Sequence, residues 1–216
     1  MAWMDRARRL GGLLWVAVGV VFGVGWAQIG GVVPGPITQV LAAVVLGLAV
    51  VVVVDHVRGV PWLLWASGWL AAVLLAAAFG GAVADRFGVF GPPGAAGVSW
   101  GRWDVFVAYT QQLLHGVPLP VAAVVAVVAT VTEVVLAVGL LSGWQRRWVA
   151  KAAAGLLTIY LLAMASTVGW DDVARYALPI EIGGALLVSV CPPRRTAPRP
   201  RGSGVGSIAT SAARTT

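Results

Sequence analysis

The sequence predicts an all-α fold: a polytopic membrane protein in which a four-helix transmembrane bundle is preceded by a two-helix N-terminal unit, giving six transmembrane helices. Of the 216 residues, 59% are hydrophobic and 11% are charged, whereas soluble domains carry about 25% charged residues. The mean hydropathy is +0.89. A membrane-spanning helix needs about 20 mostly apolar residues, and six segments approach this length: 10–28, 37–54, 60–84, 119–141, 149–170 and 173–191.

The first two segments are predicted to form the N-terminal unit, residues 1–59. A basic start before an apolar stretch is also typical of a signal peptide. Trp26-Ala27-Gln28 is a poor cleavage site, however, so we expect this helix to be retained. The other four helices are assigned to residues 60–191. Residues 192–216, rich in proline, arginine, glycine, serine and threonine, are predicted to be a disordered basic cytoplasmic tail.

The arginine and lysine residues predict the orientation of the chain, because cations near helix ends stay on the cytoplasmic side of a membrane. With the N-terminus inside, 12 of the 15 cations fall on the cytoplasmic side, and Arg86, Arg102 and Arg175 lie outside. Both termini are therefore predicted to be cytoplasmic. This orientation accounts for the net charge of +7, so the expected partner is the lipid bilayer and no nucleic acid is expected to bind.

The longest connection, residues 85–118, is predicted to lie outside. It begins with a run of glycine and proline, "DRFGVFGPPGAAG", which predicts turns. An apolar face then recurs at helical spacing: Trp103, Phe106, Val107, Thr110, Leu113 and Leu114. We expect a short helix at the membrane interface, where tryptophan and tyrosine are favoured. It is either a plain anchor or a lid over the outer end of the bundle.

Candidate cofactor ligands are few. The single cysteine, Cys191, excludes an internal disulfide, a CxxC pair and an iron–sulfur cluster. His56 and His115 are predicted on opposite sides of the membrane, so they do not jointly ligate a haem. No metal site is predicted, and electron transfer requires a partner protein or a bound quinone.

Glu133 lies in an apolar stretch, "ATVTEVVLAVGLLSG", residues 129–143. A charged side chain at the centre of a membrane helix costs roughly 2.5–3.5 kcal/mol on insertion scales. Small residues and Thr130 share the Glu133 face, and valines occupy the opposite face. Because small side chains allow helices to approach closely, Glu133 is expected to turn into the bundle and the valines toward lipid.

Glu181 and Tyr160 are the other predicted members of a buried polar cluster with Glu133. Glu181 lies on a small-residue face of the last helix, and Tyr160 lies in the middle of the fifth. If the two carboxyl groups share one depth, at least one is expected to be protonated. One interpretation is a hydrogen-bonding or proton-accepting site for a lipid-soluble ligand such as a quinone, with Thr130 as a candidate donor. The other is a set of bonds that only fixes helix packing.

Asp85 and Arg86 end the third predicted helix on its outer side. Adjacent helical residues do not face one another, so we expect separate roles for them. Arg86 is expected to cap a helix end or to pair with Asp104, Asp171 or Asp172. An anion site is the alternative interpretation.

Three stretches resemble the DoxX family of small bacterial membrane proteins, which is related to the small subunit of thiosulfate:quinone oxidoreductase. "AVADRFGVFGPPG" (82–94) resembles the end of the family's first helix and its loop, and "WGRWDVFVAYTQQL" (100–113) resembles the aromatic stretch that follows. "ATVTEVVLAVGLLSGWQRR" (129–147) resembles the second helix, in which a glutamate precedes a glycine and a Leu-Leu-x-Gly turn into a basic loop: Glu133, Gly139, Gly143, Arg146 and Arg147. The resemblance covers roughly residues 62–191.

The resemblance implies a multi-pass protein of the bacterial plasma (inner) membrane that acts as a membrane subunit of a quinone-linked oxidoreductase system, with a soluble or membrane oxidoreductase as partner. The N-terminal pair lies outside the resemblance, and Glu181 is proposed from its burial alone. Whether the chain is itself an enzyme stays open. A non-catalytic membrane scaffold or assembly protein is the alternative. A small-solute transporter is less favoured, because a 2 + 4 arrangement has no repeated halves.

Overall fold

The structure, a computed structural model, describes residues 2–29, 31, 36–59 and 61–191. These residues contain no strand and eight helices: α1 (Ala2–Gln28), α2 (Pro36–Arg58), α3 (Pro61–Arg86), α4 (Trp103–Leu113), α5 (Leu119–Ser142), α6 (Arg146–Thr167), α7 (Trp170–Arg175) and α8 (Leu178–Val190). Within α1, α2, α3, α5 and α6 lie five spans long and apolar enough to cross a membrane. The predictions of an all-α fold and of a multi-pass membrane protein are confirmed. The predicted tail, 192–216, lies outside the described residues.

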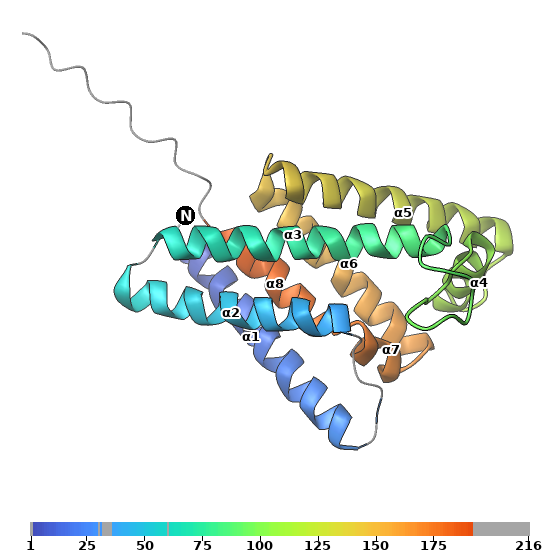
Figure 1. The fold of residues 1–216 in the computed structure, drawn as a ribbon, viewed down its shortest axis with the longest axis horizontal. Coiled ribbons are helices and arrows are strands. Elements are labelled where there is room, and N and C mark those ends of the chain that lie inside the picture. The colour runs from blue at the N-terminus through green and yellow to red at the C-terminus, as the bar shows by residue number, and fades with distance from the viewer. Residues whose placement is uncertain (1, 30, 32–35, 60, 192–216) are drawn as a thin grey trace, which may run out of the picture.

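The long helices run alternately between two ends of the molecule (Figure 1). One end holds the start of α1, the end of α8, and the α2–α3 and α5–α6 connections; the opposite end holds α4 and α7. Gly143 ends α5 with a φ of 69°, a conformation that glycine adopts without strain. This lets α6 begin three residues later and run back along α5.

Helix α8 lies in the middle of the bundle and packs on α1, α2, α3 and α6. Glycines permit the close approach: a Cβ at Gly183 would lie 2.8 Å from the backbone nitrogen of Val16 and 2.9 Å from the carbonyl oxygen of Gly12 in α1. On the adjacent face, a Cβ at Gly184 would lie 2.6 Å from the side chain of Val45 in α2. The helices of the predicted N-terminal unit therefore share one core with α8.

The predicted sixth transmembrane helix, 173–191, is divided into two. Ala177, with a φ of 48°, separates α7 from α8. Pro179 lies in the first turn of α8, where the missing N–H of proline would have no helical partner in any case. With 13 residues, α8 is about 20 Å long, shorter than the roughly 30 Å hydrocarbon core of a bilayer.

Helix α4 forms close to its predicted position, and its apolar face packs on the bundle. Phe106, Val107 and Thr110 are buried, and they pack against α5 and α3. The turns of residues 87–102 fold α4 back against the bundle (Figure 1). This helix covers the end of the bundle that also holds α7.

The predicted orientation of α5 is confirmed. Ala126, Thr130, Glu133 and Ala137 are buried. The valines of the opposite face are exposed on the outside of the bundle: Val124, Val128, Val131, Val135 and Val138.

Candidate functional site

A buried ion pair between Arg86 and Glu133 forms the centre of the site. The Arg86 Nη2 atom lies 2.7 Å from Glu133 Oε1, and the two residues are only 2% and 1% exposed. The expectation that Arg86 caps a helix or meets an aspartate is wrong. Side chains of a helix lean toward its N-terminus, so the long arginine at the end of α3 reaches back into the bundle, where α5 packs beside it.

Thr130 and Tyr160 complete the network. Arg86 Nη1 donates to Thr130 Oγ1 at 2.7 Å, and the Tyr160 hydroxyl donates to Glu133 Oε1 at 2.5 Å. Thr130 in turn donates to the carbonyl of Ala126, one turn earlier in α5. The network therefore joins α3, α5 and α6 through charge-assisted hydrogen bonds, which are stronger than neutral ones.

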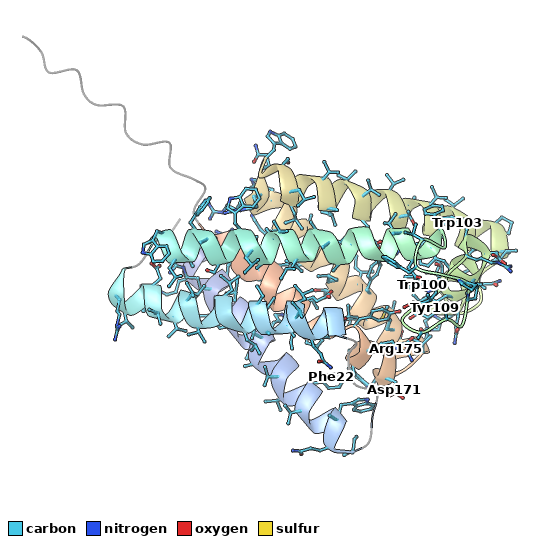
Figure 2. The ribbon with its side chains drawn as sticks, viewed as in Figure 1. Phe22, Trp100, Trp103, Tyr109, Asp171 and Arg175 are labelled. Atoms are coloured by element: carbon cyan, nitrogen blue, oxygen red, sulfur yellow. The ribbon has the colours of Figure 1, made fainter. Side chains whose placement is uncertain are left out.

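Aromatic side chains enclose the arginine. The Arg86 guanidinium carbon lies 3.8 Å from the centre of the Phe106 ring and 5.3 Å from that of Trp100. Trp100 and Phe106 are themselves buried and meet edge to face. Figure 2 shows Trp100, Trp103 and Tyr109 gathered at the end of the molecule that holds α4. These rings shield the ion pair from water on the side of α4, which strengthens the pair electrostatically.

Asp85 makes contacts separate from those of Arg86, as the helical geometry predicts. Its Oδ2 atom accepts hydrogen bonds from the backbone N–H groups of Ser99 and Trp100, both at 2.9 Å. These bonds hold the loop so that Trp100 lies over Arg86. Asp85 is therefore the residue that positions the aromatic cover.

Further polar groups continue from Asp85 toward the surface at the end of the molecule that holds α4 and α7. The Tyr176 hydroxyl donates to Ser99 Oγ at 3.0 Å, and the Tyr176 ring stacks on Trp100. The Tyr109 hydroxyl donates to Asp172 Oδ2 at 2.9 Å. At the surface, Arg102 and Asp104 form an exposed ion pair.

The stability of the protein is expected to fall as the pH rises above about 10, the ordinary pKa of tyrosine. Burial raises the pKa of Tyr109, and the neighbouring Asp172 carboxylate raises it further. The folded protein keeps this proton at a pH where the unfolded chain loses it, so unfolding becomes more favourable as the pH rises. Thermal unfolding between about pH 8 and 11 measures this slope, and Tyr109→Phe is expected to reduce it. An unchanged slope in that variant would contradict the assignment.

Glu181 does not join the cluster that the sequence predicts. Among the described residues, no hydrogen bond or ion pair links its carboxyl group to Glu133 or Tyr160. Because the last helix is broken at Ala177, Glu181 lies in the first turn of α8, one turn before Gly184, which faces α2. The helix dipole favours a carboxylate at this position. This explains a glutamate at residue 181 without any contact to Glu133.

Three buried polar atoms of the site have no hydrogen-bond partner among the described residues: Glu133 Oε2, Arg86 Nε and Asp85 Oδ1. Such groups are rare in folded proteins, and each calls for an explanation such as a bound water or ligand. The site therefore has unused hydrogen-bonding capacity, one donor and two acceptors, of which the donor and one acceptor belong to the ion pair itself.

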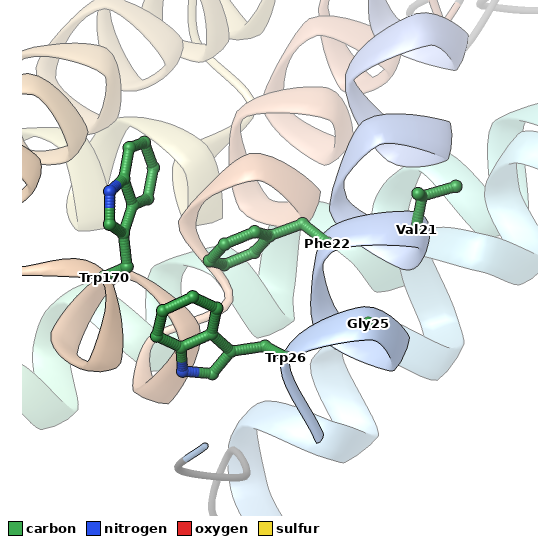
Figure 3. Close-up of a pocket in the computed structure, with 5 residues that line it drawn as sticks. All are labelled: Val21, Phe22, Gly25, Trp26 and Trp170. Atoms are coloured by element: carbon green, nitrogen blue, oxygen red, sulfur yellow. The ribbon is translucent and has the colours of Figure 1, made fainter. Parts of the chain in front are cut away.

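A groove of about 380 Å³ lies elsewhere, lined by Val21, Phe22, Gly25, Trp26 and Trp170. In Figure 3, Phe22 and Trp26 extend from α1 beside Trp170 of the neighbouring segment. Trp26 Nε1 donates to Asp171 Oδ1 at 2.8 Å. Apart from that bond the lining is apolar, and Val21 is 74% exposed, as expected of a surface that faces lipid chains.

Comparisons with protein-family models, with curated proteins and with solved structures found no match to this chain.

Proposed function

We propose that the chain is a membrane subunit of a quinone-linked oxidoreductase system and that a quinone headgroup binds beside Arg86, Glu133 and Tyr160. The observation that carries this proposal is that two atoms of the ion pair, Glu133 Oε2 and Arg86 Nε, are buried with no hydrogen-bond partner among the described residues. A quinone carbonyl accepts a hydrogen bond, which Arg86 Nε donates. A quinol hydroxyl donates one, which Glu133 Oε2 accepts. One site thus serves both redox forms.

The chemistry assigned to the chain is proton transfer. Oxidation of a quinol releases two protons and two electrons: Glu133 Oε2 accepts one proton, water takes the other, and both electrons pass to a partner oxidoreductase. Arg86 binds Glu133 Oε1 at 2.7 Å, which leaves Oε2 as the oxygen that accepts the proton. The Tyr160 hydroxyl, bonded to the same oxygen, holds the carboxylate in place.

The orientation and membrane assignment belong to the same proposal. Of the described cations, seven lie near the end that holds the start of α1 and three near the opposite end. This asymmetry supports cytoplasmic termini, and α7 with α8 then completes a sixth crossing. The resemblance to the DoxX family supports a bacterial inner membrane.

A scaffold or assembly protein is the second candidate. One specific observation favours it: a single hydrogen-bond network ties α3, α5 and α6 together, through Arg86, Thr130, Glu133 and Tyr160. In that case the ion pair serves folding alone, and the chain holds no ligand. A transporter stays the least favoured candidate. The broken α7–α8 segment is the feature that favours it, because the binding sites of transporters are typically formed by broken helices.

Mass spectrometry of lipids extracted from the gently purified protein separates the first two candidates. Wild type is expected to hold about one quinone per chain, and Glu133→Gln to lose it by tenfold or more, about 1.4 kcal/mol. Tyr160→Phe keeps the ion pair and is expected to weaken binding about 3- to 10-fold, the effect of one hydrogen bond. Because it keeps the ion pair, it tests the site even if Glu133→Gln folds poorly.

The matched control is Val135→Ala, on the exposed face of α5 two residues from Glu133. It is expected to retain quinone at the wild-type level. The same background amount of quinone in all four proteins would overturn the proposed site and favour the scaffold.

A further inference from the structure

The network around the buried ion pair reaches the surface of the bundle at Tyr160. Arg86, Thr130 and Glu133 are 2%, 8% and 1% exposed, whereas Tyr160 is only partly buried. Its hydroxyl donates to Glu133 Oε1 at 2.5 Å, and its neighbour Ile159 is 62% exposed. The Tyr160 side chain therefore extends from the surface of the bundle to the buried carboxylate.

Tyr160 lies at a depth where the surface of the bundle faces lipid. At roughly 1.5 Å per residue it is about 21 Å from the start of α6 at Arg146 and about 10 Å from the end at Thr167. The surface around it is apolar, because Ile159 and Leu162 are 62% and 63% exposed. In a chain that spans a membrane, this part of α6 contacts acyl chains rather than water.

Small side chains of α5 line the seam between α5 and α6 beside the ion pair. A Cβ at Gly139 would lie 2.9 Å from the side chain of Val149 in α6, which shows the side of α5 that faces α6. Thr132 lies two helical turns before Gly139, on the same side. Ala129, one turn before both Thr132 and Glu133, lies between them on the helix surface. Ala129 and Thr132 are partly exposed, so no large apolar side chain of α5 covers the seam at this level.

Larger groups close other sides of the site. On the side of α4, the buried rings of Phe106 and Trp100 lie over Arg86. Toward the α5–α6 connection, α5 buries Leu136 and Leu140. A ligand that came past α4 would have to separate two buried rings, whereas a ligand from the bilayer displaces one ring that is already partly exposed.

We propose that Tyr160 is the gate of a lateral entrance between α5 and α6, through which a ligand dissolved in the bilayer reaches Glu133 and Arg86. When the Tyr160 ring turns toward the lipid, its hydrogen bond to Glu133 opens and a headgroup of one planar ring enters beside Ala129. The tail of the ligand stays in the bilayer. The entrance thus selects a membrane-dissolved ring compound over a water-soluble solute. This inference rests on the proposed function for the identity of the ligand, a quinone, and adds where the quinone enters.

Carbene labelling tests the entrance without any quinone. The delipidated protein, in phosphatidylcholine vesicles, is mixed with a small uncharged aryl diazirine, which dissolves in the bilayer, or with a sulfonated aryl diazirine, which stays in water. Light converts either probe to a carbene that inserts into bonds of the nearest side chain. Peptide mass spectrometry then follows adducts on Glu133. Because this side chain is 1% exposed, its labelling from the bilayer requires that Tyr160 has moved aside.

In wild type the uncharged probe is expected to label Glu133 about tenfold or more above the sulfonated probe, because a charged group is excluded from the centre of the bilayer. Ala129→Trp fills the seam with an indole and is expected to lower labelling by about tenfold. Val135→Trp is the matched control: it adds the same indole on the exposed opposite face of α5 and is expected to match wild type. Tyr160→Phe keeps the ring but loses the bond that holds it, so labelling is expected to rise about 3- to 10-fold. This variant decides the matter if Ala129→Trp folds poorly.

Equal labelling of Glu133 by the two probes would overturn the entrance, and so would equal labelling in wild type, Ala129→Trp and Tyr160→Phe. The result is separate from that of quinone extraction. Labelling that Ala129→Trp blocks, in a protein that is found to hold no quinone, would support the entrance and reject the proposed function. A protein that holds quinone, but whose Glu133 is not labelled after delipidation, would keep the proposed function and overturn the entrance.

Discussion

Replacing Arg86 alone with methionine is expected to lower the free energy of unfolding by about 3–5 kcal/mol. The substitution leaves the Glu133 carboxylate, 1% exposed, without its cation in a medium where an unpaired charge is costly. It also removes the donor to Thr130. Denaturant unfolding in mixed micelles measures the loss. This is the larger of the two stability effects that the structure predicts.

The double variant Arg86→Met/Glu133→Leu is expected to be more stable than the single Arg86→Met variant, because apolar replacement of a whole buried ion pair is often neutral or stabilising. Arg102→Met is the matched control: Arg102 also pairs with a carboxylate, but both partners are exposed, so stability is expected to stay at the wild-type level. Equal losses for Arg86→Met and Arg102→Met would contradict the buried pair.

Gly19→Ala is expected to destabilise the protein by about 1–3 kcal/mol through overpacking. Its new Cβ would lie 2.4 Å from Ile180 Cγ1 and 2.8 Å from the Ile180 backbone nitrogen. The side chain of Ile180 can turn away, but the backbone of α8 cannot move without disturbing α2, α3 and α6, on which it also packs. Thermal unfolding in detergent measures the effect.

Gly23→Ala is the control one turn along the same helix, since nothing lies within 4 Å of a Cβ there. It is expected to be neutral or to stabilise α1 by up to about 1 kcal/mol, because alanine is the better helix former. If both alanine variants behave alike, α1 does not pack on α8 as described. The pair therefore tests directly how the N-terminal helices join the bundle.

The sequence predicted the features that depend on periodicity and composition. The long apolar segments became helices, and the small-residue face of α5 turned inward because only that face allows α3 and α6 to approach. Tyr160 is predicted as the third member of a cluster with Glu133 and Glu181, and the structure brings Tyr160 and Glu133 into contact.

The partner of Glu133 was not predicted. Arg86 is 47 residues away and was placed among the outer loop residues because it ends its helix. A helix end marks the position of the backbone, whereas an arginine side chain extends several ångströms from it and leans back along the helix. The available signal was the presence of opposite buried charges on two neighbouring membrane helices, since such charges are rarely left unpaired.

The break at Ala177 was also missed, and with it the position of Glu181. The hydrophobic pattern of residues 173–191 is continuous, so periodicity alone indicated one helix. Pro179 was the one local signal: a proline fits the first turn of a helix better than its interior. Reading it as a helix start places Glu181 in the first turn of α8.

Photocrosslinking with a quinone that carries a photoreactive group on its headgroup tests the central claim most directly. The account predicts adducts on the segments of α3, α5 and α6 around Arg86, Glu133 and Tyr160, and their loss in Tyr160→Phe or on competition with unmodified quinone. Adducts confined to the apolar groove at Phe22, Trp26 and Trp170, or spread evenly over the exposed valines, would contradict it and would leave the buried ion pair a purely structural element.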